Sequence, residues 1–553
     1  MARGRNAIRF QPIASWTGAR PTDLEAGQAF RHDFYQPEEE RSRNVYVSRR
    51  GLVRVRPGYG IVLDVPRNIL AIYSRSLATE GVQYLVTATE ILEVAGNTVV
   101  QSYPDPVAIS SDTLPWQIIQ LGFEAERPRF FVLGNELSAP LKKFVPNVGY
   151  NLVTTADFGE LRAYGMAVVG GRIVLVNTYE AGQRTPERIR WSQALDGTQW
   201  PPLNFIDVYG LGEAIAIANL TQNDAIVYYS RGAVLLTAQA GLESEAFTAR
   251  VLSNDIVPPV RQSALASVEN SHYYIGIDNQ IYVTGYESSA QISGLVAEEI
   301  GRIASSYESP FRLVAYEPTE QAIYCFFGGE QETFTLRFDV QRKLLAPPWF
   351  IPELITAVDS LVVDTKDPWF TDLDPWDTPA GPWREGAVRG FSPGFTAGVA
   401  VKGERGPELV HLFGNEPTDD AAGIDWVVSW HSASMQDPRF RITPDTIDID
   451  GIRVPVRPGD ETEVSVRLFS KKSPYALSRT PVLRANIDLN DETKWRRPLD
   501  PVLPGALDGS AMIPSNYLEL TIAGYQFRSR ELFAFVSVLG NVSERTDEFG
   551  VQL

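Results

Sequence analysis

The side chains that most often carry nucleophilic or zinc chemistry are scarce in this chain of 553 residues, which has one cysteine, Cys325, and four histidines. The histidines are far apart in the sequence: His32, His272, His411 and His431. None lies in a Gly-x-Ser-x-Gly context. Nucleophilic catalysis usually needs a base beside the nucleophile, and zinc sites need clustered Cys and His. We therefore expect surface or packing histidines, no nucleophilic site and no zinc site.

Carboxylates are numerous, with 68 Asp and Glu, so counting alone leaves a two-carboxylate glycosidase open. The segment 191–200 resembles the Asp-box turn of sialidases, although the spacing from Ser192 to Asp196 is too long. Asp boxes are structural turns, so the segment indicates a turn. Two further groups of aspartates are candidates for calcium: Asp448 with Asp450, and Asp372, Asp374 and Asp377. Neither follows the calcium loop with its distant Glu, so we interpret them as solvated faces of a strand and a loop.

No glycine-rich loop ending in Lys-Ser or Lys-Thr is present, so nucleotide binding lacks support. The sequence thus predicts a protein that is not an enzyme and has no catalytic residues, no metal and no cofactor. The elements that would position any site are strands. Gly and Pro are frequent, at 43 and 38, and Met is scarce, which favours short strands and turns over helices.

Strand-like runs rich in Val, Ile, Tyr and Phe recur along the chain at 83–94, 129–133, 172–176, 225–236, 272–283 and 322–338. They start roughly 43 to 52 residues apart, close to the ~40–50 residues of a four-stranded propeller blade. A sandwich would show turns every 8–12 residues without a longer period. The repeat predicts an all-β fold with a β-propeller of about six blades, complete or partial. Cys325 lies in the last run and is expected to be a buried small hydrophobe.

The composition divides the chain into four expected parts: a basic N-terminal arm and hairpin at 1–60, the propeller at 61–361, an acidic Pro- and Trp-rich insertion at 362–423, and a C-terminal β-sandwich or barrel at 424–553. The C-terminal assignment depends on alternation such as that of 463–469. In the insertion, Trp369, Trp376 and Trp383 either form a peripheral contact surface or fold back onto the parent domain.

Charge is uneven along the chain. The net charge is −18, but residues 1–60 hold eleven Arg, no Lys and six acids (11 − 6 = +5), which leaves −23 for the rest. A basic arm on an acidic body indicates docking to an acidic partner, through Arg3, Arg5, Arg9 and Arg20, unless these are ordinary surface residues. The polar N-terminus and the lack of about 18 consecutive apolar residues predict no signal peptide and no membrane span.

Three passages form an ordered set. The first is Asn44-Val45-Tyr46 with a short hairpin that leads to Arg56-Pro57-Gly58. The second is 170–177 followed by Arg190-Trp191-Ser192 and Trp200. The third is 247–282, in which Asn279 stands where Gly is more usual. Together they resemble the tail hub or nozzle proteins of short-tailed bacteriophages, also called packaged-DNA stabilisation proteins, over about residues 40–350.

The resemblance implies a structural virion protein of the phage tail, assembled in the host cytoplasm. It implies a homo-hexameric ring below the portal and the adaptor that retains packaged DNA and lets double-stranded DNA pass non-specifically. The adaptor and tail fibres or tailspikes are the implied partners, and Arg3, Arg5, Arg9 and Arg20 would dock to the adaptor or portal. The alternative is a propeller glycan hydrolase or a carbohydrate-binding β module that uses Trp369, Trp376 and Trp383.

Overall fold

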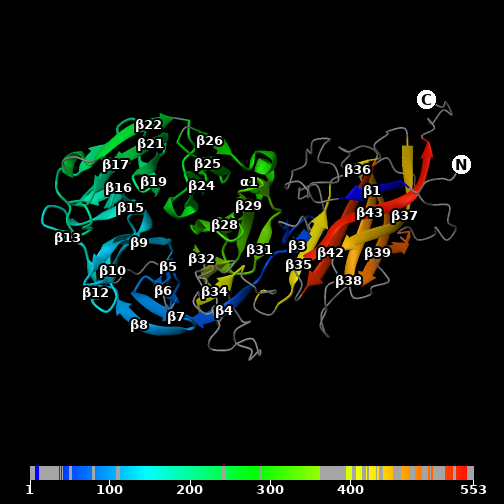
Figure 1. Cartoon of the computed structure of the whole chain (residues 1–553), viewed down its shortest axis with the longest axis horizontal. Coiled ribbons are helices and arrows are strands. Elements are labelled where there is room, and N and C mark those ends of the chain that lie inside the picture. Colours follow the sequence, from blue (N-terminus) through cyan, green and yellow to red (C-terminus); the bar gives the residue numbers. More distant parts are fainter. Residues whose placement is uncertain are drawn as a thin grey trace, which may run out of the picture.

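The computed structural model describes residues 6–10, 37, 39, 41–48, 53–76, 81–107, 113–239, 243–253, 255–286, 288–360, 394–400, 406–413, 419, 422–430, 433–434, 440–451, 463–471, 480–488, 496–498, 500–501, 517–526 and 531–544. Side chains of the strands at 6–10, 440–451 and 531–544 are outside the description. Within the described residues, antiparallel strands dominate, and they form a ring of sheets beside a second β unit (Figure 1).

Six blades follow one another along the chain, each a sheet with its first strand innermost. Blade 1 is β5 (Ala71–Ser76), β6 (Gly81–Val86), β7 (Glu90–Ala95) and β8 (Thr98–Pro104). Blade 2 is β9 (Trp116–Glu124), β10 (Arg127–Gly134), β11 (Ala139–Val145) and β12 (Gly149–Leu152). The ribbon β13 (Thr154–Thr155) and β14 (Gly159–Glu160) leads to blade 3, which is β15 (Arg162–Val169), β16 (Arg172–Glu180), β17 (Gln183–Trp191) and β18 (Phe205–Asp207).

Blade 4 is β19 (Ala214–Asn219), β20 (Asp224–Tyr229), β21 (Gly232–Ala238) and β22 (Phe247–Ser253). Blade 5 is β23 (Leu265–Val268), β24 (Ser271–Ile275), β25 (Ile281–Thr284) and β26 (Ser289–Gln291), followed by the helix α1 (Ala297–Ala304). Blade 6 is β27 (Arg312–Glu317), β28 (Ala322–Gly328), β29 (Thr333–Asp339), β30 (Leu344–Leu345) and β31 (Trp349–Ile351). Four short 3-10 turns complete these blades: η2 (Asn135–Leu137), η3 (Glu243–Glu245), η4 (Gln262–Ala264) and η5 (Gly294–Val296).

A seventh sheet closes the ring with strands from both ends of the propeller. β32 (Leu354–Ser360), β33 (Phe395–Ala400) and β34 (Glu408–Leu412) are completed by β4 (Tyr59–Asp64), which pairs antiparallel with β34. The innermost strands contact one another in a closed cycle, β5-β9-β15-β19-β23-β27-β32-β5. The predicted all-β propeller is therefore confirmed, and it has seven blades within the described residues instead of about six.

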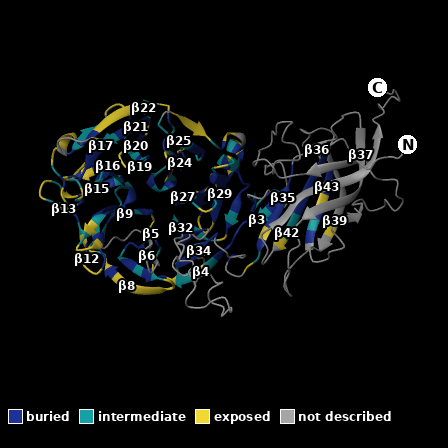
Figure 2. Ribbon diagram, in the orientation of Figure 1, coloured by how far each residue is buried: buried dark blue, intermediate teal, exposed yellow. Residues whose placement is uncertain are grey.

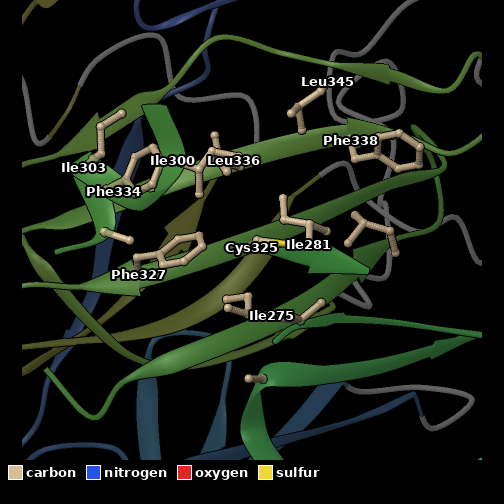
Figure 3. Close-up of a cluster of buried hydrophobic side chains, with 14 of the residues drawn as sticks. Ile275, Ile281, Ile300, Ile303, Cys325, Phe327, Phe334, Leu336, Phe338 and Leu345 are labelled. Atoms are coloured by element: carbon tan, nitrogen blue, oxygen red, sulfur yellow. The ribbon is translucent and has the colours of Figure 1, made fainter. Parts of the chain in front are cut away.

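Blade-on-blade packing explains the sequence repeat. A middle strand is covered by a neighbouring blade on each face, so every residue of β28 and β29 is buried. Figure 3 shows Cys325 and Phe327 of β28 within one such core, with Ile300 and Ile303 of α1 against the same cluster. The expected burial of Cys325 is confirmed. Outer strands such as β8 are exposed, as Figure 2 shows, and they lack this continuous apolar signal.

The C-terminal part holds two six-stranded sheets. One contains β1 (Asn6–Phe10), β2 (Val45–Val47), β3 (Val53–Val55), β37 (Phe440–Gly451), β40 (Arg496–Pro498) and β43 (Glu531–Glu544). The other contains β35 (Ile424–Ser429), β36 (Ala433–Ser434), β38 (Glu463–Lys471), β39 (Thr480–Asp488), β41 (Asp500–Pro501) and β42 (Tyr517–Gln526). The sheets approach each other where β2 lies beside β35 and β1 beside β36. The predicted C-terminal β domain is confirmed.

The sheets correct three expected boundaries. The propeller is not limited to 61–361, because β33 and β34 extend it to Leu412 and β4 begins at Tyr59. Residues 395–412 therefore belong to blade 7 and not to the insertion expected at 362–423. The expected N-terminal unit at 1–60 is not separate, because β1 and β3 pair with β43 of the C-terminal part.

Candidate functional site

The axis of the propeller holds a cavity of about 310 Å³, bounded by innermost strands of blades 1, 2, 5, 6 and 7. Its lining includes the apolar side chains of Ile72, Ile118, Leu313 and Val358, together with the polar residues Gln117, Gln262 and Ser263. An innermost strand pairs with its own blade only on its outer side, so the cavity is also bordered by backbone edges. A cavity of this size on a propeller axis is the natural first candidate for a ligand site.

Two glutamine side chains, Gln117 and Gln262, line this axial cavity and narrow the central channel of the propeller. The Gln117 Oε1 accepts from the Met166 N–H at 2.9 Å, and the Gln117 Nε2 donates to the Met166 carbonyl at 3.2 Å. Gln262 does the same with Ile217, at 2.8 Å for both bonds. Gln262 also lies against Gly165, where an added Cβ would collide with its amide. Each side-chain amide thus hydrogen-bonds to the backbone of another blade. Gln117 of blade 2 bonds to blade 3, and Gln262 of blade 5 bonds to blade 4 and contacts blade 3.

Charged residues lie at the end of the channel where the innermost strands begin. Arg261, just before η4 of blade 5, places its Nη1 3.4 Å from Glu136 Oε1 of η2 in blade 2. Arg312 is buried and donates to the carbonyls of Ser309 and Gly328, each at 3.0 Å. Burial, followed by the nearby Arg261, lowers the pKa of Arg312 to about 10. This mouth is therefore spanned by an ion pair and carries two desolvated cations.

Blade 7 and blade 1 meet at the opposite end of their innermost strands. The Ser74 N–H donates to Asp359 Oδ2 at 2.6 Å. Burial raises the pKa of Asp359 to about 6, against the lowering effect of this hydrogen bond. The contact strengthens the point at which the ring closes.

A second polar centre joins the propeller to the C-terminal sheets. The Arg56 guanidinium is buried and forms a two-bond ion pair with Asp419, with 2.8 Å between Nη1 and Oδ1. It also donates to the Phe350 carbonyl at 2.7 Å and to Asn44 Oδ1 at 3.0 Å. Five donors in a planar fork suit arginine to such a site.

Asn44 extends this centre to both parts of the molecule. Its φ is 57°, a left-handed conformation that Asn tolerates better than most residues. Its Oδ1 accepts from the Phe350 N–H of blade 6 at 2.9 Å, and its Nδ2 donates to the Asp425 carbonyl of β35 at 2.7 Å. Arg56 and Asn44 thus form a joint between the propeller and the C-terminal sheets. The first motif of the sequence analysis is this joint.

The second motif is structural in blade 3. Arg190 is buried, its Nε donates to Glu180 Oε1 at 2.7 Å, and its guanidinium lies over the Phe158 ring. Trp191 is fully buried in the core between blades 3 and 4. Asp196 accepts from the Thr198 N–H at 2.9 Å, as in a structural turn. The segment 191–200 therefore folds as the turn that the sequence predicted.

In the third motif, His272 is buried between blades 4 and 5. Its Nδ1 lies 2.9 Å from the Tyr228 hydroxyl and its Nε2 lies 2.8 Å from the Asn219 carbonyl. Since a carbonyl only accepts, Nε2 carries the proton and Nδ1 accepts from Tyr228. Burial lowers the pKa of His272 to about 4. His272 is a packing residue, as expected, whereas His32 and His431 are outside the described residues.

The residues predicted to dock or to contact partners are mostly outside the described part of the chain. This holds for Arg3, Arg5, Arg20, Trp369, Trp376 and Trp383. Arg9 lies on β1, opposite Ser537 of β43. Asp448 and Asp450 lie on β37, whereas Asp372, Asp374 and Asp377 are again outside. In the described ranges, no group of three or more His, Cys, Asp or Glu could hold a metal.

The sequence analysis did not predict the role of Arg56 or of the two glutamines that line the axial cavity, Gln117 and Gln262. Gln117 lies near the start of β9 and Gln262 lies in η4 before β23, and neither belongs to a motif, so no local signal distinguishes them. The sequence shows Arg56 only as the residue to which a short hairpin leads, because its partner Asp419 is 363 residues away. The one available signal was an Arg directly before Pro-Gly at the end of the hairpin.

No family model and no curated protein matches the chain. Among solved structures, BBS1N in complex with ARL6DN is 12% identical, with 65% of this chain and 98% of that chain covered and a TM-score of 0.37. PorZ, a surface component of the type-IX secretion system of Porphyromonas gingivalis, is 10% identical, with 69% and 43% covered and a TM-score of 0.33. The designed protein Ika8 is 10% identical, with 54% and 93% covered and a TM-score of 0.32.

None of the described helices has both the length and the apolar character needed to cross a membrane.

Proposed function

We propose that this protein is a structural component of a short phage tail, a nozzle ring below the adaptor that retains and releases packaged DNA. The observation that carries the proposal is that residues of the three ordered motifs hold the fold together. Asn44 and Arg56 form the joint between domains, Arg190 and Trp191 support blade 3, and His272 is buried between blades 4 and 5. Residues that hold blades and domains together suit a ring component, because a ring transmits force through its subunits.

The narrow centre of the propeller constrains where DNA would pass in such a ring. The axial cavity of about 310 Å³ is bordered by the amides of Gln117 and Gln262. The major groove alone is about 12 Å wide, and the whole duplex is wider than its groove. A duplex therefore cannot pass through the narrow centre of a single propeller. The bore of the proposed ring therefore lies between copies, where the net charge of −18 would keep DNA from adhering.

Electron microscopy and mass photometry of the full chain, alone and with the adaptor, test the proposal. We expect a homo-hexameric ring that binds the adaptor. Replacing Arg3, Arg5 and Arg20 with Gln should weaken adaptor binding at least tenfold. The matched control replaces Arg231, Arg250 and Arg302, which are exposed on the propeller, and should bind as the wild type does. A monomer that never binds the adaptor would contradict the proposal.

A glycan screen tests the alternative function, a hydrolase or a carbohydrate-binding module. The proposal expects neither sugar release nor binding. Sugar release that is lost in a Trp376→Ala variant would favour the alternative and replace the nozzle.

A further inference from the structure

One lysine lies where a charged side chain is exceptional, on a middle strand of blade 2. Lys142 is on β11, between β10 and β12, and its side chain is 0% exposed. It packs at the core shared by blades 1 and 2, with its Nζ 4.8 Å from the centre of the Trp116 ring and 5.6 Å from that of Tyr150. Lysine is almost never fully buried unless it is paired, so this position needs an explanation.

The partner of this lysine is a carboxyl group from the neighbouring blade. Asp105 follows β8, the outer strand of blade 1, and its side chain is also 0% exposed. Its Oδ2 accepts from Lys142 Nζ, and its Oδ1 accepts from the Val107 N–H at 2.7 Å. The Asp105 N–H donates to the Thr89 carbonyl at 2.8 Å, which fixes the backbone of the aspartate. The amine and the carboxyl group are therefore held in contact, as two groups must be to react without diffusing together.

The surroundings of the pair favour its uncharged form. Burial lowers the pKa of Lys142, although the hydrogen bond and the charge of Asp105 act in the opposite direction. A proton that passes from the ammonium to the carboxylate leaves an amine and a carboxylic acid, which an apolar core accommodates at a lower desolvation cost than two ions. The neutral amine has the lone pair that a nucleophile needs.

A tyrosine hydroxyl lies beside the same pair. Among the described residues, the Tyr150 hydroxyl is one of the buried groups without a well-formed hydrogen bond. Burial, and then the nearby Asp105, raise the pKa of Tyr150 well above 10. The hydroxyl therefore keeps its proton and can donate to a carboxyl oxygen on which negative charge develops.

We propose that Lys142 and Asp105 react with each other and form an amide bond between blades 1 and 2. After the proton transfer, the Lys142 Nζ lone pair attacks Asp105 Cγ, and the electron pair of the C=O bond moves to the oxygen that Tyr150 stabilises. A proton then passes from the nitrogen to the hydroxyl on the same carbon, the C–O bond breaks, and water leaves. One ammonium and one carboxylate thus become one amide and one water, and no oxidant or reductant is needed.

Intact-mass spectrometry of the denatured full chain tests the proposal. We expect the wild type to be lighter than its sequence predicts by one water molecule, and a proteolytic digest to contain a branched peptide that joins Asp105 to Lys142. Aspartate can also lose water by forming a succinimide with the next backbone nitrogen. That route is closed to Asp105, because Pro106 follows it and has no N–H.

Three variants separate the lysine, its neighbour and the hydroxyl. Lys142→Arg keeps a cation but should show the full mass. Lys143→Arg is the matched control, because Lys143 pairs with Glu124 at 2.8 Å in a partly exposed position, and it should lose water as the wild type does. Tyr150→Phe should slow the reaction at least tenfold, measured as the bonded fraction at successive times after a pulse of cell-free synthesis.

The wild type carries the decisive measurement, so the test does not depend on whether a variant folds. The full mass for the folded wild type would overturn the proposal and leave a buried ion pair. A loss of water that persists in Lys142→Arg would overturn it as well, because the reaction would then lie elsewhere. Equal rates for Tyr150→Phe and the wild type would overturn the role of the hydroxyl. None of these outcomes bears on ring formation, so the proposed function is tested separately.

Discussion

At the scale of single residues, the burial of His272 couples the stability of the propeller to pH. Its folded pKa is about 4, whereas an unfolded histidine titrates near 6.5. The folded state therefore holds the neutral ring, and the stabilising contribution is fully present above pH 6.5. As the pH falls from 6.5 to 4, the unfolded chain takes up a proton that the folded chain does not. Stability is lost over this window, by roughly 3 kcal/mol in total.

His272→Gln should remove this pH dependence. Gln retains a donor and an acceptor for Asn219 and Tyr228 but does not titrate, so the variant should be less stable at pH 7.5 and lose less on acidification. Tyr228→Phe is the control, because it removes one hydrogen bond and leaves the histidine to titrate. Denaturant midpoints at pH 7.5, 5.5 and 4.5 check the prediction. Parallel pH profiles for His272→Gln and the wild type would contradict it.

At the scale of elements, blade 7 depends on strand β4, which comes from the far end of the propeller sequence. Gly60 of β4 is the register partner of His411 of β34. A Gly60→Cys/His411→Cys disulfide would close a loop of nearly the whole propeller, and long loops constrain the unfolded chain most, by roughly 6 kcal/mol in the entropic model. We expect a large rise in the denaturation midpoint under oxidising conditions.

A disulfide within one blade is the matched control for this closure. Val283 and Ala290 are register partners in β25 and β26, only seven residues apart in the sequence. The same entropic model gives Val283→Cys/Ala290→Cys about half the stabilisation. Equal midpoint shifts for the two pairs would show that ring closure through β4 does not limit unfolding.

The elements that sequence reasoning found and missed differ in burial. The six recognised runs correspond to middle strands of six blades, such as β28 and β29, whose two faces are both covered. Blade 7 was missed because 33 residues outside the described part, 361–393, separate β32 from β33, and β4 precedes the other blades. A periodic pattern cannot reveal a strand that pairs across the whole propeller. The ion pair of Arg261 and Glu136 was missed for the same reason, since these two residues meet only when the ring closes.

At the scale of the whole molecule, the joint decides whether the propeller and the C-terminal sheets behave as one body. The Arg56 and Asp419 side chains are 1% and 7% exposed. A buried ion pair adds little net stability over a well-packed apolar pair. Removal of one partner, however, leaves the other charge buried and unpaired, which costs about 3–5 kcal/mol. Breaking the joint should therefore lower the free energy of unfolding by more than the intact ion pair adds to it. In a proposed ring, it would keep the orientation of the two parts constant.

Arg56→Met should therefore separate the two parts in unfolding. It leaves the Asp419 carboxylate buried without its partner and removes the bonds to Phe350 and Asn44. We expect calorimetry to show one cooperative transition for the wild type and two for the variant, the first at lower temperature. Arg43→Met is the matched control, because Arg43 pairs with Asp425, whose side chain is 56% exposed, and such pairs contribute at most about 1 kcal/mol. A single transition for Arg56→Met, shifted no more than that of Arg43→Met, would show that the coupling lies in other contacts between blade 6 and β2, such as the bond from Trp349 Nε1 to the Val45 carbonyl, and not in the joint.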